Sequence, residues 1–217
     1  ALEGSALLAF PAAVAFLVLG VPICEALYRG LASDALALFG GRGSAFTARD
    51  AAQTGAALAL FGAGLPAFVW HKVLSPAYYA REDTKTPMRY ALIAIAVNTV
   101  LALALFPLVG FLGVPLATSI AAWVQVALLA GGLSRSGGLA LTARLVGRLA
   151  RTAGASVALA AFLAACAPYT ERYAALTFGR EWVAVVLLCG AGLALYGLAA
   201  LALGAVRLSD YKRATAT

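Results

Sequence analysis

Six long apolar stretches divide this sequence, and they limit its possible folds more than any motif does. They cover residues 5–28, 54–79, 88–107, 113–133, 146–168 and 182–206. A helix needs about 20 apolar residues to cross roughly 30 Å of hydrocarbon, and each stretch is that long. Lipid offers backbone groups no partner, so a spanning segment must satisfy them internally. The runs lack the polar–apolar alternation of membrane strands. The sequence therefore predicts an all-α polytopic membrane protein with six transmembrane helices.

Composition supports the same class. Hydrophobic residues make up 63% of the 217-residue chain and charged residues 12%, whereas soluble domains are about half apolar and about a quarter charged. The net charge of +7 would suggest nucleic acid for a soluble protein. Here the basic residues lie in short connectors, where they meet phospholipid headgroups. We therefore expect membrane lipids around the chain and no nucleic acid.

The connectors differ in positive charge. One set, which includes the C-terminal tail, carries Arg81, Lys85, Arg89, Arg135, Arg144, Arg148, Arg151, Arg207, Lys212 and Arg213. The other set carries Arg29, Arg42, Arg49, Arg172 and Arg180. Cytoplasmic connectors are enriched in Lys and Arg, so the richer set is assigned to the cytoplasm. Both ends of the chain are then cytoplasmic, as an even number of crossings requires.

The second stretch contains residues that are unusual in a membrane. Lys72 lies about 10 Å from its predicted end, so its side chain either faces a cavity or extends to the headgroups. Adjacent helical residues point about 100° apart, so only one of His71 and Lys72 is expected to face a cavity. We expect His71 to be interfacial or hydrogen-bonded. Pro66 and Pro76 lack an N–H donor and predict a kink, which could act as a hinge.

Few other polar residues occur within the stretches. Asn98 is central in the third, and Thr118 and Gln125 share one face of the fourth because they are seven apart. Such residues either form hydrogen bonds between helices or contact substrate. The candidates for a substrate cavity are therefore Lys72, Asn98 and Gln125.

No chemistry-bearing pattern accompanies these residues. There is no Ser–His–Asp set, paired-carboxylate motif or phosphate-binding glycine loop, and Cys24, Cys166 and Cys189 lack metal-ligand spacing. We expect no catalytic residues, no metal site and no cofactor. The sequence does not indicate a coupling ion.

The connectors carry local signals. Thr47 and Asp50 have the spacing of a capping box, and Thr86-Pro87 favours a helix start with Pro in the first turn. LASDALALF, in the long glycine-containing connector 29–50, is expected to form a short interfacial helix. Glu82 and Asp83 lie beside Arg81 and Lys85 after the second stretch, which predicts a solvated loop whose charges neutralise each other.

The segment KVLSPAYYAREDTKTPMRYALIAIAVNTV and the glycine turn after it resemble the lipid II flippase family MurJ, also called MviN. That family belongs to the multidrug/oligosaccharidyl-lipid/polysaccharide exporter superfamily. The matching positions are Lys72, Pro76, Tyr79, Arg81, Asp83, Lys85, Thr86, Pro87, Asn98 and Gly113. The resemblance is good over residues 5–135 and rests on position and hydropathy beyond them.

The resemblance implies a two-lobed flippase fold of which these helices form the C-terminal part. Residues 1–135 would supply four helices of the lobe, and 136–217 the last two, a groove for the lipid tail, and a cytoplasmic tail. It implies a transporter and not an enzyme, in the bacterial inner membrane. Its implied substrate is lipid II, an undecaprenyl-diphosphate-linked peptidoglycan precursor, moved by alternating access.

The resemblance also implies that the arginines that bind the diphosphate lie mostly in the first lobe and the early second lobe, outside this chain. The chain begins within an apolar pattern, so we expect it to be a piece of a longer protein whose N-terminal helices complete the transporter. Two alternatives stay open: another exporter of the superfamily, for drugs or polysaccharide-lipids, and a non-transporting membrane scaffold. The Lys-Thr-Pro loop argues against the first, and the second predicts that replacing Lys72 or Asn98 by Leu changes no function.

Overall fold

The computed structural model describes residues 2–31, 46–138, 143–167 and 181–204, and all regular structure in these ranges is helical. The long helices are α1 (Leu2–Cys24), α3 (Ala48–Tyr79), α4 (Lys85–Val109), α5 (Gly113–Arg135), α6 (Ala143–Cys166) and α8 (Glu181–Ala202). A π-helical segment, η1 (Glu25–Leu31), extends α1, and a 3₁₀ turn, η2 (Gly110–Leu112), joins α4 to α5. The predicted all-α membrane fold is confirmed.

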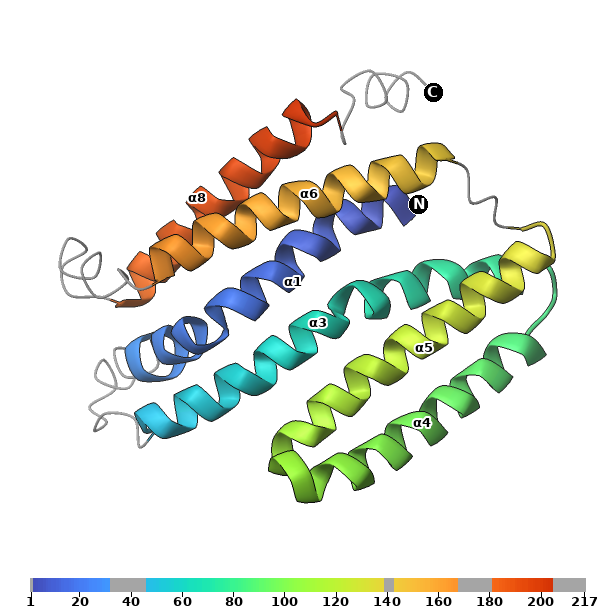
Figure 1. The fold of residues 1–217 in the computed structure, drawn as a ribbon, viewed down its shortest axis with the longest axis horizontal. Coiled ribbons are helices and arrows are strands. Elements are labelled where there is room, and N and C mark those ends of the chain that lie inside the picture. The colour runs from blue at the N-terminus through green and yellow to red at the C-terminus, as the bar shows by residue number, and fades with distance from the viewer. Residues whose placement is uncertain (1, 32–45, 139–142, 168–180, 205–217) are drawn as a thin grey trace.

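The described residues contain five continuous helical stretches that are long and apolar enough to cross a membrane, against six predicted crossings. The difference lies in Lys85–Arg135, a stretch of 51 residues that contains α4, η2 and α5. The chain reverses at Gly110, whose φ of 64° suits a residue without Cβ. Because α4 and α5 run antiparallel side by side (Figure 1), this one stretch corresponds to two of the predicted crossings.

The six long helices form a row in the order α8, α6, α1, α3, α5, α4 (Figure 1). α1 therefore lies between α6 and α3 although it comes first in the chain. α1 and α3 are antiparallel and approach closely, because glycines meet the partner backbone: Gly55 faces Val21, and Gly20 faces Gly55. Small residues allow this approach in membrane helices.

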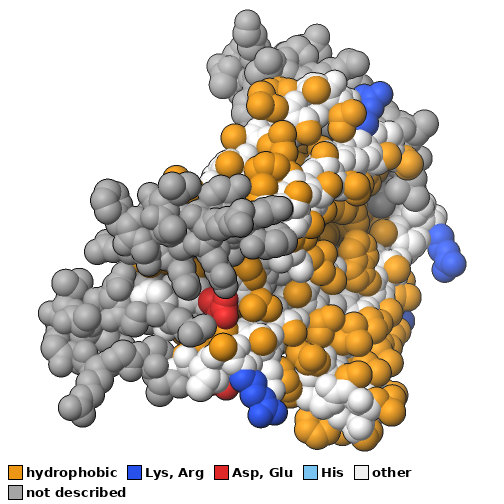
Figure 2. Space-filling view, turned by 60° about the vertical axis from the view of Figure 1, so that its left-hand side comes forward, with side chains coloured by type: hydrophobic (Ala, Val, Ile, Leu, Met, Phe, Trp, Pro, Cys, Tyr) orange, Lys and Arg blue, Asp and Glu red, His pale blue; other side chains and the backbone are white. Residues whose placement is uncertain are grey.

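Two clusters of buried residues hold the row together. One joins α1, α6 and α8 through Leu19, Ala155, Leu159, Leu163, Leu188, Tyr196 and Ala200. The other joins α3 and α5 through Ala67, Leu74, Tyr78, Ala122, Val126, Leu129 and Leu133. Many large apolar side chains stay exposed, among them Leu103 and Leu108 of α4. Figure 2 shows a face dominated by hydrophobic side chains, with Lys and Arg near its margins. Lipid is the solvent that accommodates such a surface.

Two local predictions are confirmed. The Asp50 N–H donates to Thr47 Oγ1 at 3.2 Å and the Thr47 N–H donates to Asp50 Oδ2 at 2.9 Å, which completes the capping box that begins α3. Pro87 lies in the first turn of α4. The expected interfacial helix, LASDALALF, lies almost entirely outside the described residues, as do Arg172, Arg180 and the C-terminal tail.

Candidate functional site

A cavity of about 410 Å³ lies between α3, α4 and α5. Its lining residues are Phe68, His71 and Lys72 of α3, Ala91, Ala94, Ile95 and Asn98 of α4, and Thr118, Ala121, Ala122 and Gln125 of α5. On each helix they follow the i, i+3, i+4 pattern, extended to i+7 on α4 and α5, which is typical of a single helical face. α3 and α4 both pack along α5 but hardly touch each other. The alanines on α4 and α5 leave the space between them open.

All three predicted cavity residues, Lys72, Asn98 and Gln125, line this one cavity. Their role in transport stays a prediction. His71 lines the cavity as well, so the expectation that only one of the two neighbours faces a cavity is wrong. The cavity borders both α4 and α5 and therefore covers an arc of α3 wide enough for adjacent residues.

Hydrogen bonding leaves most polar groups of the cavity available. Thr118 Oγ1 lies 2.9 Å from the Val114 carbonyl of its own helix and 3.4 Å from Asn98 Oδ1. A hydroxyl has one hydrogen, so the shorter bond dominates and the contact with Asn98 is weak. The Lys72 and Gln125 side chains form no hydrogen bond or ion pair with any residue in the described ranges. Among the described residues, an unpaired ammonium, the unbonded Gln125 amide and the weakly bonded Asn98 amide therefore line this cavity, together with His71 and Thr118.

α3 continues through both predicted kink residues, Pro66 and Pro76. Figure 1 shows α3 bending in its second half, which contains them. α5 donates to α3 carbonyls just before Pro66: Ser119 Oγ to Leu60 at 2.7 Å, and Trp123 Nε1 to Ala63 at 3.0 Å. The bend is thus held against α5, and its use as a hinge stays a prediction.

The α3–α4 loop is organised differently from the sequence expectation. Asp83 Oδ1 accepts the Thr86 N–H at 3.0 Å, which caps the start of α4, while Arg81 Nη1 donates to Ser136 Oγ beyond α5 at 2.9 Å. Hydrogen bonds from Thr86 lower the pKa of Asp83 below its ordinary value. Among the described residues no ion pair forms inside this loop. Asp83 is bonded at the start of α4 and Arg81 just beyond the end of α5, so these two charges do not pair with each other.

A second pocket lies at this end of the bundle. Arg81, Asp83 and Thr86 of the predicted motif loop line it, whereas Lys85 and Pro87 do not. The sequence reasoning missed the remaining lining residues, Tyr78, Tyr90, Gly132, Arg135 and Ser136. Arg135 was counted only as a charge that sets orientation. The signal in the sequence was the assignment of the end of the second stretch, the start of the third and the end of the fourth to the same side of the membrane.

No three His, Cys, Asp or Glu side chains in the described ranges are placed to hold a metal ion. Cys24, Cys166 and Cys189 are free thiols.

Comparison with known proteins agrees with the motif resemblance. The sequence model of a family described as "Lipid II flippase MurJ" matches residues 1–189. A probable lipid II flippase MurJ of Rhizobium tropici is 45% identical over 132 residues, which cover 61% of this chain and 22% of that protein. That of Vibrio cholerae serotype O1 is 35% identical over 208 residues, 96% of this chain and 37% of that protein.

A third relative, from Rhizobium meliloti, is 34% identical over 226 residues, covering 97% of this chain and 37% of its own length. The chain thus spans between 22% and 37% of the length of these relatives. The matches to the Vibrio cholerae and Rhizobium meliloti proteins extend over nearly all of this chain. Together with the membrane helices and the loop motif, they show that this chain belongs to the lipid II flippase MurJ family.

Proposed function

We propose that this chain forms part of a flippase that moves lipid II from the inner to the outer leaflet of the bacterial cytoplasmic membrane. The observation that carries the proposal is the polar cavity between α3, α4 and α5, with its free lysine, in a member of this family. The rest of the intact protein completes the transport path.

Lys72 is the strongest single argument for a substrate in this cavity. A lysine in a membrane helix costs up to roughly 2.5–3.5 kcal/mol at the helix centre and less toward the ends. Lys72 lies seven residues before the end of α3, and it is a functional candidate because it also lines the cavity. Within the described ranges Lys72 has no carboxylate partner to offset that cost. An anionic substrate would supply the missing charge. We assign Lys72 as one cation of a larger cavity whose main diphosphate-binding charges belong to the rest of the protein.

Asn98 and Gln125 suit the uncharged part of lipid II. Each amide offers both donors and an acceptor, which match sugar hydroxyls and peptide groups. They project from α4 and α5 into the space that Lys72 also lines. The cavity therefore combines charge recognition with groups that bind a polar, uncharged moiety.

α6 and α8 are assigned to the polyprenyl tail. Residues 152–166 and 182–202 contain no Asp, Glu, Lys, Arg or His. Large apolar side chains on these helices point outward, including Val157, Leu193 and Leu198. Such a surface suits a hydrocarbon chain and offers nothing to a headgroup.

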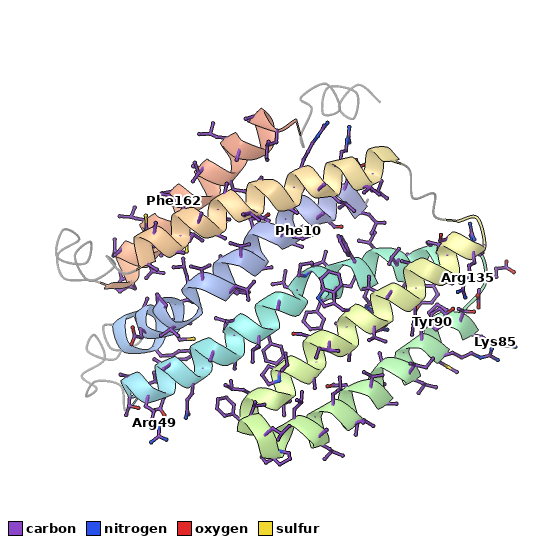
Figure 3. All side chains as sticks on the ribbon, in the orientation of Figure 1. Phe10, Arg49, Lys85, Tyr90, Arg135 and Phe162 are labelled. Carbon is purple, nitrogen blue, oxygen red and sulfur yellow. The ribbon has the colours of Figure 1, made fainter. Side chains whose placement is uncertain are left out.

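The positive charges support the cytoplasmic orientation. Arg81, Lys85, Arg89, Arg135, Arg148 and Arg151 lie at the end of the bundle where α3 and α5 finish and α4 and α6 begin. Arg49 lies at the opposite end (Figure 3). The positive-inside rule places the richer end in the cytoplasm. The bend of α3 at its prolines is then the proposed hinge of alternating access.

Depletion of the intact protein in its host tests the function. We expect lipid II to accumulate in the inner leaflet and its exposure on the outer leaflet to fall, measured with an impermeant reagent that labels or cleaves exposed lipid II. Re-expression of the intact protein restores exposure. Unchanged exposure after depletion would overturn the proposal. Export of cationic drugs, or function that survives loss of the cavity's polar groups, would instead favour the exporter or the scaffold.

A further inference from the structure

A pocket of about 500 Å³ lies where α3 ends, α4 begins and α5 ends. Its lining combines two arginines with hydroxyl groups: Tyr78, Arg81, Asp83, Thr86, Tyr90, Gly132, Arg135 and Ser136. Figure 3 shows Tyr90 and Arg135 together at this end of the bundle, near Lys85. The pocket is separate from the Lys72 cavity, because no residue lines both.

The only carboxylate in the lining is already engaged. Asp83 caps α4 through the Thr86 N–H, and among the described residues it forms no ion pair with either arginine. The pocket therefore keeps a net positive charge. An anion entering it would not have to displace an existing salt bridge.

The two arginines differ in how many of their hydrogen-bond donors are already used. Arg81 donates through Nη1 to the Ser136 hydroxyl, and its other guanidinium nitrogens are left for a ligand. Arg135 is exposed and forms no hydrogen bond or ion pair with a described residue. The Tyr90 hydroxyl likewise has no such partner, whereas Tyr78 donates to the Leu129 carbonyl at 2.7 Å. Two guanidinium groups and one hydroxyl thus offer free donors to the same space.

The frame around these donors is fixed. The α5 C-terminus closes with Gly137 at φ 69°, and the Gly138 N–H bonds to the Leu133 carbonyl at 2.8 Å, which is a Schellman motif. Gly132 has no Cβ, and a Cβ there would lie 2.5 Å from the Tyr78 hydroxyl oxygen. The pocket is therefore framed by the Schellman end of α5 and the close packing at Gly132, and the α3–α4 loop contributes Arg81 and Asp83.

We propose that this pocket binds a phosphate group through Arg135, Arg81 and Tyr90. Paired guanidinium groups suit phosphate oxygens because their donors match them in geometry and charge. The pocket lies at a helix-end surface where phospholipid headgroups are found, and basic pockets between membrane helices bind anionic headgroups. The phosphate comes either from an anionic phospholipid or from solution. The site stands independently of the flippase proposal.

The test uses the purified intact protein in phosphatidylcholine nanodiscs, with two probes, short-chain phosphatidylglycerol and inorganic phosphate, measured by calorimetry. Arg135→Gln is the informative variant, because Arg135 supports no structural contact among the described residues. We expect it to weaken binding about tenfold, the scale of a charge-assisted hydrogen bond. Arg89→Gln removes the same charge from an exposed site on α4 outside the pocket and should weaken binding less than about twofold.

The outcomes separate the two sources of phosphate. If the intact protein binds phosphatidylglycerol but not inorganic phosphate, and Arg135→Gln weakens that binding, the ligand is the lipid headgroup. If Arg135→Gln weakens the binding of inorganic phosphate, the ligand is the soluble ion. If neither probe responds to Arg135→Gln, or if Arg89→Gln weakens binding as much, the proposal is overturned. Arg135→Lys, which keeps the charge but loses the forked donors of the guanidinium, should recover only part of the affinity.

Discussion

The two sides of the helix row treat their polar groups in opposite ways. In the filled half, α1, α6 and α8, the Tyr196 hydroxyl donates to the Leu7 carbonyl at 3.0 Å and Arg148 pairs with Glu3. In the hollow half, α3, α4 and α5, the side chains of Lys72, Gln125 and Arg135 have no partner among the described residues. Polar side chains that are hydrogen-bonded within the protein stabilise a helix bundle, whereas unbonded ones are available to bind a ligand. The filled half is therefore expected to carry stability alone, whereas the hollow half combines the α3–α5 contacts that hold it together with free groups for binding.

Truncating the core of the filled half should have the largest effect. Leu163 is 1% exposed, so Leu163→Ala is expected to lower the free energy of unfolding by about 2–5 kcal/mol. Thermal unfolding of the intact protein in detergent measures this. Val157→Ala on the same helix is the control, because Val157 is 68% exposed. Equal losses for the two variants would contradict a packed core on this side.

The Arg148–Glu3 pair should come next. Its side chains are 18% and 32% exposed, between the surface and buried cases, so Arg148→Gln is expected to cost about 1–3 kcal/mol. The Arg148→Gln/Glu3→Gln double variant should lose less than the sum of the single losses. Arg151→Gln, an exposed change one turn away, is the control. Additive single losses would show that the pair does not act as a unit.

Lys72→Met tests whether the free groups of the hollow half serve binding and not stability. We expect lipid II exposure to fall about tenfold, or about 1.4 kcal/mol. The unfolding temperature should stay the same or rise, because an unpaired charge leaves the membrane. Lys85→Met, at an exposed position outside both pockets, controls for loss of charge. A drop in stability without a drop in transport would place Lys72 among the structural residues.

Two buried serines sharpen the contrast at a smaller scale. Ser119, 4% exposed, donates from α5 to the Leu60 carbonyl of α3, whereas Ser156, 3% exposed, donates to Thr152 within its own helix. Ser119→Ala should lower the free energy of unfolding by about 0.6 kcal/mol, the average interhelical value. Ser156→Ala should cost less, since its bond to the Thr152 carbonyl is local and the Tyr196 hydroxyl of α8, which it also contacts, keeps its bond to the Leu7 carbonyl. The reverse order would show that α3 and α5 do not depend on this contact.

The smallest effect concerns the start of α4 and depends on pH. The pKa of Asp83 is lowered from its ordinary value of 3.8 by hydrogen bonds from Thr86. The carboxylate's stabilisation is therefore complete above about pH 4 and is lost as pH falls through the lowered pKa. Protection of the Thr86 amide against hydrogen exchange should follow this curve. In Asp83→Asn, which caps without titrating, protection should not depend on pH.

Sequence alone predicted the long membrane helices, because apolar length and the need to satisfy backbone groups in lipid leave few alternatives. It also predicted the capping box at Thr47, the start of α4 near Thr86-Pro87, and the family. These depend on local hydrogen bonding or on a contiguous motif. The helix-face spacing even selected Thr118 and Gln125 as neighbours before the fold was known.

Only the tertiary structure decided which of these groups share a space. Lys72, Asn98 and Gln125 meet because α5 separates α3 from α4 and leaves a gap that alanines do not fill. Arg81 and Asp83 are only two residues apart in the sequence, but Arg81 donates to Ser136 after α5 and Asp83 caps α4, so they do not pair with each other in the arginine pocket. The apolar stretches thus determined that the chain spans the membrane. The order of helices in the row, which no local pattern encodes, decided where its free charges lie.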